Sequence, residues 1–101
     1  MKFLIIEDDA NIVEAMTIAF RMHWPGAEIF STGSGEQGVE LAKRSSIDII
    51  ILDLKLDDIS GFDVLTRIRA FSNTPIFILT VTMDEPSIVK GLELGADDYI
   101  V

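Results

Sequence analysis

Short apolar runs alternate along this chain with amphipathic stretches, and this alternation strongly limits the folds open to it. The clearest run, at residues 49–52, holds four consecutive apolar side chains. Such a run is typical of a strand buried on both faces, as in a parallel sheet. The expected strands are residues 2–6, 28–30, 47–52, 76–79 and 99–101.

Amphipathic stretches lie between these strands. In the first, apolar residues recur at helical spacing, at Ile12, Met16 and Phe20. Turn residues separate the elements, including a turn expected at 33–35 and Gly95 as a helix end. The expected helices are residues 10–22, 36–44, 61–70 and 85–94. The order of strands and helices predicts an α/β domain, with a parallel sheet covered by helices on both faces.

The composition of the chain further limits the functions that it can have. A chain of 101 residues forms one domain, and its hydrophobic fraction of 49% allows burial to offset chain entropy. The net charge of −9 repels phosphate backbones, so we expect no direct nucleic-acid or membrane binding by this segment. No cysteine is present, which excludes disulfides, thiolate metal sites and cysteine nucleophiles. The N-terminal apolar run is too short for a signal peptide or a membrane span, so a cytoplasmic location is expected.

Polar residues follow three of the expected strands. They are Glu7 to Asp9 after the first strand, Asp53 after the third and Thr80 after the fourth. In open parallel sheets the functional site lies at the carboxyl ends of the strands. Carboxylates that meet there repel one another, so they need a cation, a shared proton or water. Oxygen ligands without histidine or cysteine favour Mg²⁺, and this arrangement suits phosphoryl transfer to a carboxylate.

A simpler role exists for part of this cluster. Asp8 and Asp9 precede a helix, where acids are favoured as caps, and for that pair capping stays open. Asp53 differs, because an isolated acid at the end of the most buried strand has no helix to cap. A dinucleotide site is excluded, because the first turn is acidic and not a glycine-rich phosphate cradle. Asp97 and Asp98 are expected only to solvate a turn.

Four segments, in the same order and at the same spacing, resemble the receiver domain of bacterial two-component response regulators (the CheY-like family). They are LIIEDDANI, DIIILDLKLDDISGFDVL, PIFILT and GLELGADDYIV, and they are distributed from one end of the chain to the other. The resemblance implies a flavodoxin-like three-layer sandwich, with a five-stranded parallel sheet in the order 2-1-3-4-5.

The resemblance also implies roles for the acids. Asp53 matches the residue that accepts the phosphoryl group. Asp8 and Asp53 match direct Mg²⁺ ligands, and Glu7 matches a ligand that acts through water. Lys55 matches the position whose backbone carbonyl binds the metal.

The same resemblance implies which residues respond to phosphorylation and which proteins interact with the domain. Thr80 matches the hydroxyl that hydrogen-bonds the bound phosphoryl group, and Tyr99 matches the aromatic residue that then turns inward. A sensor histidine kinase is the implied phosphodonor, and the domain assists its own phosphorylation without being an enzyme. The remodelled face of the fourth helix and fifth strand would control an output domain or a homodimer, and through it transcription.

The sequence departs from the family pattern in several places. It ends at Val101, before the usual lysine and the last helix, so we expect a receiver at 1–101 whose natural chain continues. A sheet without that helix would leave apolar surface on one face. Asp57 replaces a frequent proline and Val81 a small residue, and Lys55 adds a cation beside the site.

Two other functions remain as alternatives. A pseudo-receiver would bind proteins without phosphorylation, which the missing lysine, Val81 and Asp57 favour. A phosphatase of the haloacid-dehalogenase type would use Asp53 as nucleophile, but it needs an acid where this chain has Lys55.

Overall fold

The structure, a computed structural model, describes residues 1–79 and 85–100. Strands and helices alternate along these residues as the sequence predicted. They are β1 (Lys2–Ile6), α1 (Ala10–His23), β2 (Glu28–Thr32), α2 (Gly35–Arg44), β3 (Ile49–Asp53), α3 (Gly61–Arg69), β4 (Ile76–Leu79), α4 (Glu85–Glu93) and β5 (Asp98–Ile100). None of the described helices is both long enough and apolar enough to cross a lipid bilayer.

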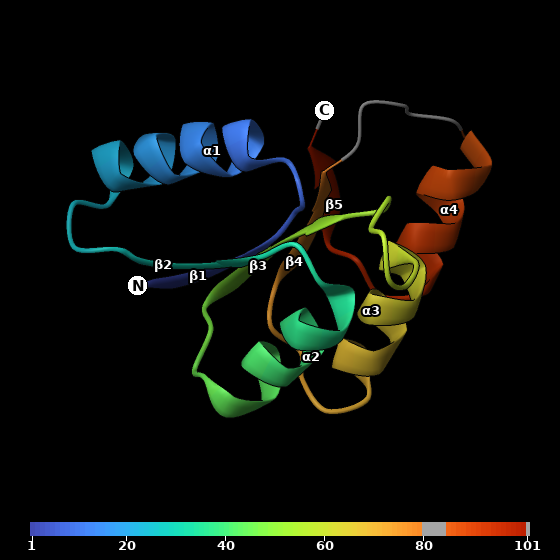
Figure 1. Cartoon of the computed structure of the whole chain (residues 1–101). Helices are drawn as coiled ribbons and strands as arrows, with labels where there is room; N and C mark the ends of the chain where they lie inside the picture. Colours follow the sequence, from blue (N-terminus) through green and yellow to red (C-terminus); the bar gives the residue numbers. More distant parts are fainter. Residues whose placement is uncertain (80–84, 101) are drawn as a thin grey trace.

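The five strands form one parallel sheet in the order β2-β1-β3-β4-β5, which confirms the predicted flavodoxin-like order. Ile6 at the end of β1 pairs with Thr32 of β2 and with Leu52 of β3. The carboxyl ends of these strands therefore meet at one edge. Figure 1 shows α1 on one face of the sheet and α2 and α3 on the other, which gives the expected three layers. The helices of the described residues are α1 to α4, in agreement with a fold that lacks the last helix.

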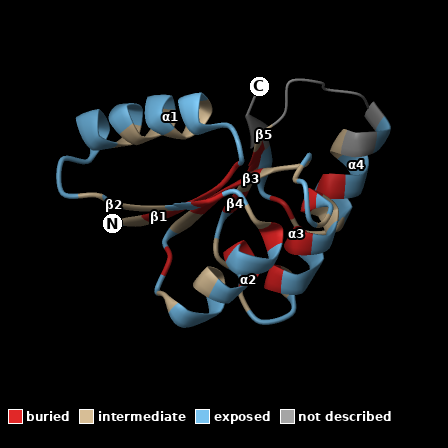
Figure 2. Ribbon diagram, in the orientation of Figure 1, coloured by how far each residue is buried: buried red, intermediate tan, exposed pale blue. Residues whose placement is uncertain are grey.

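The main core lies between the sheet and helices α2 and α3 (Figure 2). Alternate residues of β1, β3 and β4 meet apolar residues of these helices there, and each fully buried one contributes roughly 1.5–3 kcal/mol of transfer free energy. Gly38 allows α2 to lie close to β1, because a Cβ at this position would come within 2.5 Å of Ile6 Cδ1. The core side chains are Leu4, Ile6, Val39, Ile47, Ile50, Leu52, Val64, Leu65, Ile68, Ile76, Ile78 and Ala96.

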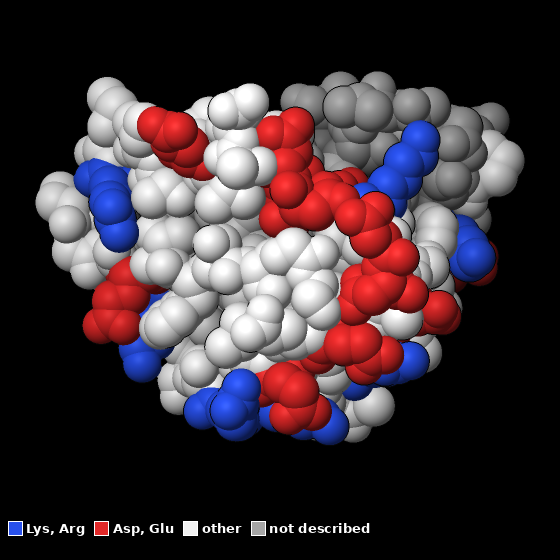
Figure 3. Space-filling model, viewed as in Figure 1, with Lys and Arg blue, Asp and Glu red and all other residues white. Residues whose placement is uncertain are grey.

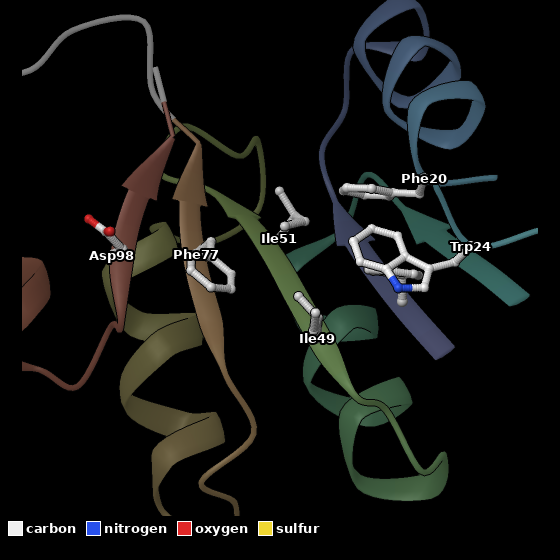
Figure 4. A pocket seen from close by; sticks show the side chains of 7 residues that line it. Phe20, Trp24, Ile49, Ile51, Phe77 and Asp98 are labelled. Carbon is white, nitrogen blue, oxygen red and sulfur yellow. The ribbon is translucent and has the colours of Figure 1, made fainter. Parts of the chain in front are cut away.

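The opposite face of the sheet is only partly covered. Phe20 of α1 stacks on Phe3 of β1 with ring centroids 4.4 Å apart, and Trp24 packs against the same ring at 5.4 Å. Beyond these rings lies an apolar recess of about 350 Å³ (Figure 4), which is the apolar surface expected on one sheet face. Its lining consists of Phe3, Phe20, Trp24, Ile49, Ile51, Phe77 and Asp98.

Arg69 connects several segments at the amino ends of the strands. Its guanidinium donates to the carbonyls of Gly95 and Thr74, at 2.8 and 2.7 Å, and to Asp97 Oδ2 at 3.0 Å. The same Asp97 oxygen accepts from the backbone N–H of Ile76 at 2.8 Å. The expectation that Asp97 only solvates a turn is therefore wrong. We call Arg69, Asp97 and these partners the Arg69 network.

Candidate functional site

Three acidic side chains meet at the carboxyl edge of the sheet. Glu7 and Asp8 directly follow β1, and Asp53 is the last residue of β3. Since β1 and β3 are paired in parallel, with Ile6 opposite Leu52, the chain leaves both strands at the same level. Glu7, Asp8 and Asp53 each place one carboxylate oxygen within 4.8 Å of the other two. The sequence predicted this meeting, and the structure confirms it for these three acids.

The neighbouring acids Asp8 and Asp9 have different roles. Asp9 is the N-cap of α1, where its Oδ1 accepts the backbone N–H of Asn11 at 2.9 Å and of Ile12 at 3.4 Å. Asp8 joins the three-acid cluster. The capping interpretation is thus correct for Asp9, whereas Asp8 lies in the three-acid cluster and its role as a metal ligand stays a prediction. Capping by Asp9 fixes the start of α1 immediately after the cluster.

Glu7 is the most enclosed member of the cluster, with a residue exposure of 5%. Its Oε1 accepts the backbone N–H of Asp9 at 3.2 Å. Burial raises the pKa of Glu7 to about 7, helped by a hydrogen bond with Asp53 and by the negative charges of Asp53 and Asp8. The cluster therefore favours either a retained proton or a cation, as the sequence argument required.

Asp53 is half-buried, so it is not sealed away from solvent. Its Oδ1 accepts the backbone N–H of Lys55 at 3.1 Å. Gly61 begins α3 directly against this segment and donates its backbone N–H to the Leu54 carbonyl at 3.0 Å. A Cβ on Gly61 would lie 2.4 Å from the Asp53 carbonyl oxygen, so only glycine permits this approach. Gly61 is thus the first residue of the helix that the sequence predicted at 61–70.

A shallow recess beside the cluster gives access to it. The recess has a volume of about 390 Å³ and is bounded by the start of α1 and the end of β2. Gly33 closes one side, where a Cβ would lie 3.3 Å from Asp8 Cβ. Figure 3 shows that acidic atoms form a band across this face of the molecule. The recess lining consists of Glu7, Asp8, Ala10, Val13, Glu14, Ser31, Thr32 and Gly33.

Sequence reasoning missed Asp58, which lies in the loop between β3 and α3. Its carboxylate accepts hydrogen bonds from Ser34 and from the first backbone N–H groups of α2. These bonds, first from Glu36 and then from Gly35, hold the pKa of Asp58 well below its usual range. No local sequence pattern predicts a hydrogen bond between residues more than twenty positions apart.

The donor set of the three-acid cluster fits Mg²⁺. It consists of carboxylate oxygens, the chain has no cysteine, and its one histidine, His23, lies at the far end of α1. Mg²⁺ prefers such hard oxygen ligands and keeps several waters, which the open recess can admit.

The roles of the predicted switch residues stay predictions. Thr80 and Val81 lie outside the described residues, and of Tyr99 only the backbone, within β5, is described. The metal-binding role of the Lys55 carbonyl also stays a prediction, as does phosphorylation of Asp53.

Known proteins share both the sequence pattern and the fold. The profile described as "Response regulator receiver domain" matches residues 3–101. Cell cycle transcriptional regulator CtrA of Caulobacter vibrioides is 44% identical over 101 residues, which cover 99% of this chain and 43% of CtrA. The chain thus spans less than half the length of this curated relative.

Two solved structures illustrate the likeness in fold. The BeF3-activated N-terminal receiver domain of Klebsiella pneumoniae RstA superposes with a TM-score of 0.91 at 25% identity, covering 99% of this chain and 84% of that one. The receiver domain of sensor histidine kinase PA1611 from Pseudomonas aeruginosa PAO1 gives 0.81 at 25% identity, covering 99% and 83%. The chain therefore belongs to the response regulator receiver domain family.

Proposed function

We propose that this receiver domain takes a phosphoryl group from a sensor histidine kinase onto Asp53 and changes conformation in response. The observation that carries this proposal is the meeting of Glu7, Asp8 and Asp53 within 4.8 Å, with Asp53 only half-buried. A structural role alone gives no reason to gather three acids at one sheet edge, because their mutual repulsion is unfavourable.

In the transfer, a carboxylate oxygen of Asp53 attacks the phosphorus of a phosphohistidine. The new bond joins Asp53 to phosphorus, the phosphorus–nitrogen bond breaks, and the histidine nitrogen keeps the electron pair and gains a proton. The bond from the Lys55 N–H to Asp53 Oδ1 orients the carboxylate for this attack.

Glu7, Asp8, Asp53 and the Lys55 carbonyl would hold Mg²⁺ in this site. When bound, Mg²⁺ would offset the negative charge that the acids and the incoming phosphoryl group bring together. Two findings on relatives support this. A magnesium ion is coordinated in the active site cleft of the PA1611 receiver domain, and the RstA receiver domain is activated by BeF3.

The phosphoryl group adds nearly two negative charges, and this is the signal that the rest of the domain must detect. By family likeness, Thr80 and Tyr99 pass the change to the face of α4 and β5. CtrA is a transcriptional regulator and more than twice as long as this chain. We therefore place this domain in a longer protein or a homodimer whose output, as in CtrA, is transcription.

A direct experiment is to add acetyl phosphate or beryllofluoride, with and without Mg²⁺, and to follow Asp53 by mass spectrometry and NMR. We expect Mg²⁺-dependent modification of Asp53. Asp53→Asn should abolish it, whereas Asp57→Asn, which removes the same charge nearby, should retain it. Modification that persists in Asp53→Asn would show that the site is wrong. No response in the wild-type domain, and none when the chain is extended past Val101, would favour the pseudo-receiver.

A further inference from the structure

Asp58 ties together two loops that are far apart in sequence. Its Oδ1 accepts the Gly35 backbone N–H, and its Oδ2 accepts the Glu36 backbone N–H and the Ser34 hydroxyl, all at 2.9 Å. Ser34 Oγ in turn accepts the Gln37 N–H at 3.1 Å. The N–H groups that open α2 are thus satisfied by Asp58 and Ser34, and the negative charge of Asp58 suits the positive end of the helix.

Each of the two loops borders the three-acid cluster. The loop from β2 to α2 contains Gly33, which packs against Asp8 so closely that a Cβ would lie 3.3 Å from the Asp8 Cα. The loop from β3 to α3 contains Lys55, whose N–H binds Asp53. Asp58 therefore joins the segment that supports one expected metal ligand to the segment that carries the other.

The loop after Asp53 is held in part by apolar packing, because Leu54, Leu56 and Ile59 lie against the core. It lacks the proline often found at position 57, and Asp57 itself makes none of the hydrogen bonds or ion pairs recorded for the described residues. Ile59 beside Asp58 anchors the same point, since it packs against Gly35 with no room for a Cβ. The carboxylate of Asp58 and the side chain of Ile59 thus fix the loop against α2.

We propose that Asp58 is a positioning residue: it holds the Lys55 carbonyl and Asp53 in the arrangement that Mg²⁺ needs. This inference rests on the proposed function. Asp58 itself is not a ligand in this scheme, because its oxygens are engaged by α2.

Variants that separate positioning from stability provide the first test. Mg²⁺ affinity is measured by calorimetry, under conditions where circular dichroism shows each variant folded. In Asp58→Asn the side-chain NH2 faces donors, so Mg²⁺ should bind roughly fivefold more weakly. Asp57→Asn removes the same charge at the adjacent position and should change the Mg²⁺ affinity less than about twofold. Ser34→Ala should lower the stability of α2 but leave Mg²⁺ affinity within about twofold, because the two backbone bonds to Asp58 remain.

Linkage provides a second test that needs no variant. If the Asp58 contact strengthens Mg²⁺ binding, Mg²⁺ must strengthen the contact by the same factor. In the wild-type domain, Mg²⁺ should therefore slow hydrogen exchange of the Gly35 and Glu36 amides roughly fivefold more than that of Gly38, which bonds to the Ser34 carbonyl.

The outcomes distinguish the two proposals. Equal Mg²⁺ affinity in Asp58→Asn and Asp57→Asn overturns the role of Asp58 while the proposed function stands. If Asp58→Asn does not fold, equal slowing of the three amides in the wild-type domain overturns it. Failure of the wild-type domain to bind Mg²⁺ with a response at Asp53 overturns both.

Discussion

Glu7 shows how the three-acid cluster affects the stability of the fold. Its pKa is raised from 4.5 to about 7 by burial and by its acidic neighbours. Between these two pH values the folded state keeps a proton that the unfolded state releases. The contribution of this group to the free energy of unfolding is thus complete below about pH 4.5 and is lost as the pH rises through about 7. Asp58 acts in the opposite direction and at lower pH, since its lowered pKa gives stability that is lost only on acidification.

Glu7→Gln should remove this pH dependence. Without the ionisable group, the free energy of unfolding near pH 8 should rise by roughly 1–3 kcal/mol, with little change near pH 5. Urea unfolding at the two pH values, without divalent cations, measures the effect. A variant that follows the wild-type pH profile would show that Glu7 is ionised in the folded domain.

Binding of Mg²⁺ should also change the ionisation of Glu7, in the direction opposite to the effect of burial. A divalent cation near the cluster favours the ionised form of Glu7, so binding should release protons near neutral pH. Calorimetric titration in buffers of different ionisation enthalpy measures this release, and Glu7→Gln should reduce it. Equal proton release by that variant would exclude Glu7 as the source.

At the scale of elements, the start of α3 depends on one glycine. Gly61 lies where α3 begins directly against the end of β3, and a Cβ would meet the Asp53 carbonyl oxygen and Leu54 Cα at 2.4 and 2.6 Å. Both are backbone atoms, so the conflict can be relieved only by moving α3 or the strand end.

Gly61→Ala should therefore destabilise the domain by roughly 2–3 kcal/mol. Gly26→Ala is the matched control, because nothing lies within 4 Å of its Cβ position, and we expect a change within about 0.5 kcal/mol. Denaturant unfolding of both variants provides the comparison. Similar stabilities would show that the α3 start tolerates a side chain.

The sequence predicted the elements well where apolar pattern decides them. β1 and β4 have the expected bounds, because both are apolar runs followed by polar residues. β2 was expected to end at residue 30, but it continues to Thr32, because pairing with Ile6 of β1 extends the strand through polar residues. α2 begins at Gly35, where a turn was expected, because Ser34 and Asp58 cap it there.

The site was predictable to the same degree. Because β1 and β3 are parallel neighbours, Asp8 and Asp53 follow strands that end at the same edge, so their meeting follows from the strand order that the resemblance implied. Asp58 and Arg69 were not predictable, since their bonds join residues whose proximity depends on how helices and loops pack. In the sequence, Asp58 is only one of several acids in the segment that follows β3.

At the scale of the whole molecule, the three-acid cluster and the Arg69 network lie at opposite ends of the sheet. The three-acid cluster lies at the carboxyl ends of the strands. The Arg69 network lies at the amino ends, where α3 ends and β4 and β5 begin. With a side-chain exposure of only 16%, Arg69 depends on these acceptors for its hydrogen bonds.

Arg69→Met should lower the free energy of unfolding by roughly 2–4 kcal/mol, because Asp97 and several carbonyls lose a charged donor. Arg67→Met is the control on the same helix. Its ion pair with Glu36 is half exposed, so we expect a loss under about 1 kcal/mol. Both variants should bind Mg²⁺ like the wild-type domain. Weakened Mg²⁺ binding in folded Arg69→Met would contradict this separation of the two ends.

Trp24, the only tryptophan of the chain, borders the apolar recess and follows the end of α1 that is far from Asp8. The maximum of its fluorescence emission will therefore report the solvent exposure of that side of the sheet. Any group that fills the recess should shift the emission to the blue, while events confined to the acidic edge leave it almost unchanged. This side chain thus monitors the partly covered face of the sheet from a position away from the three-acid cluster.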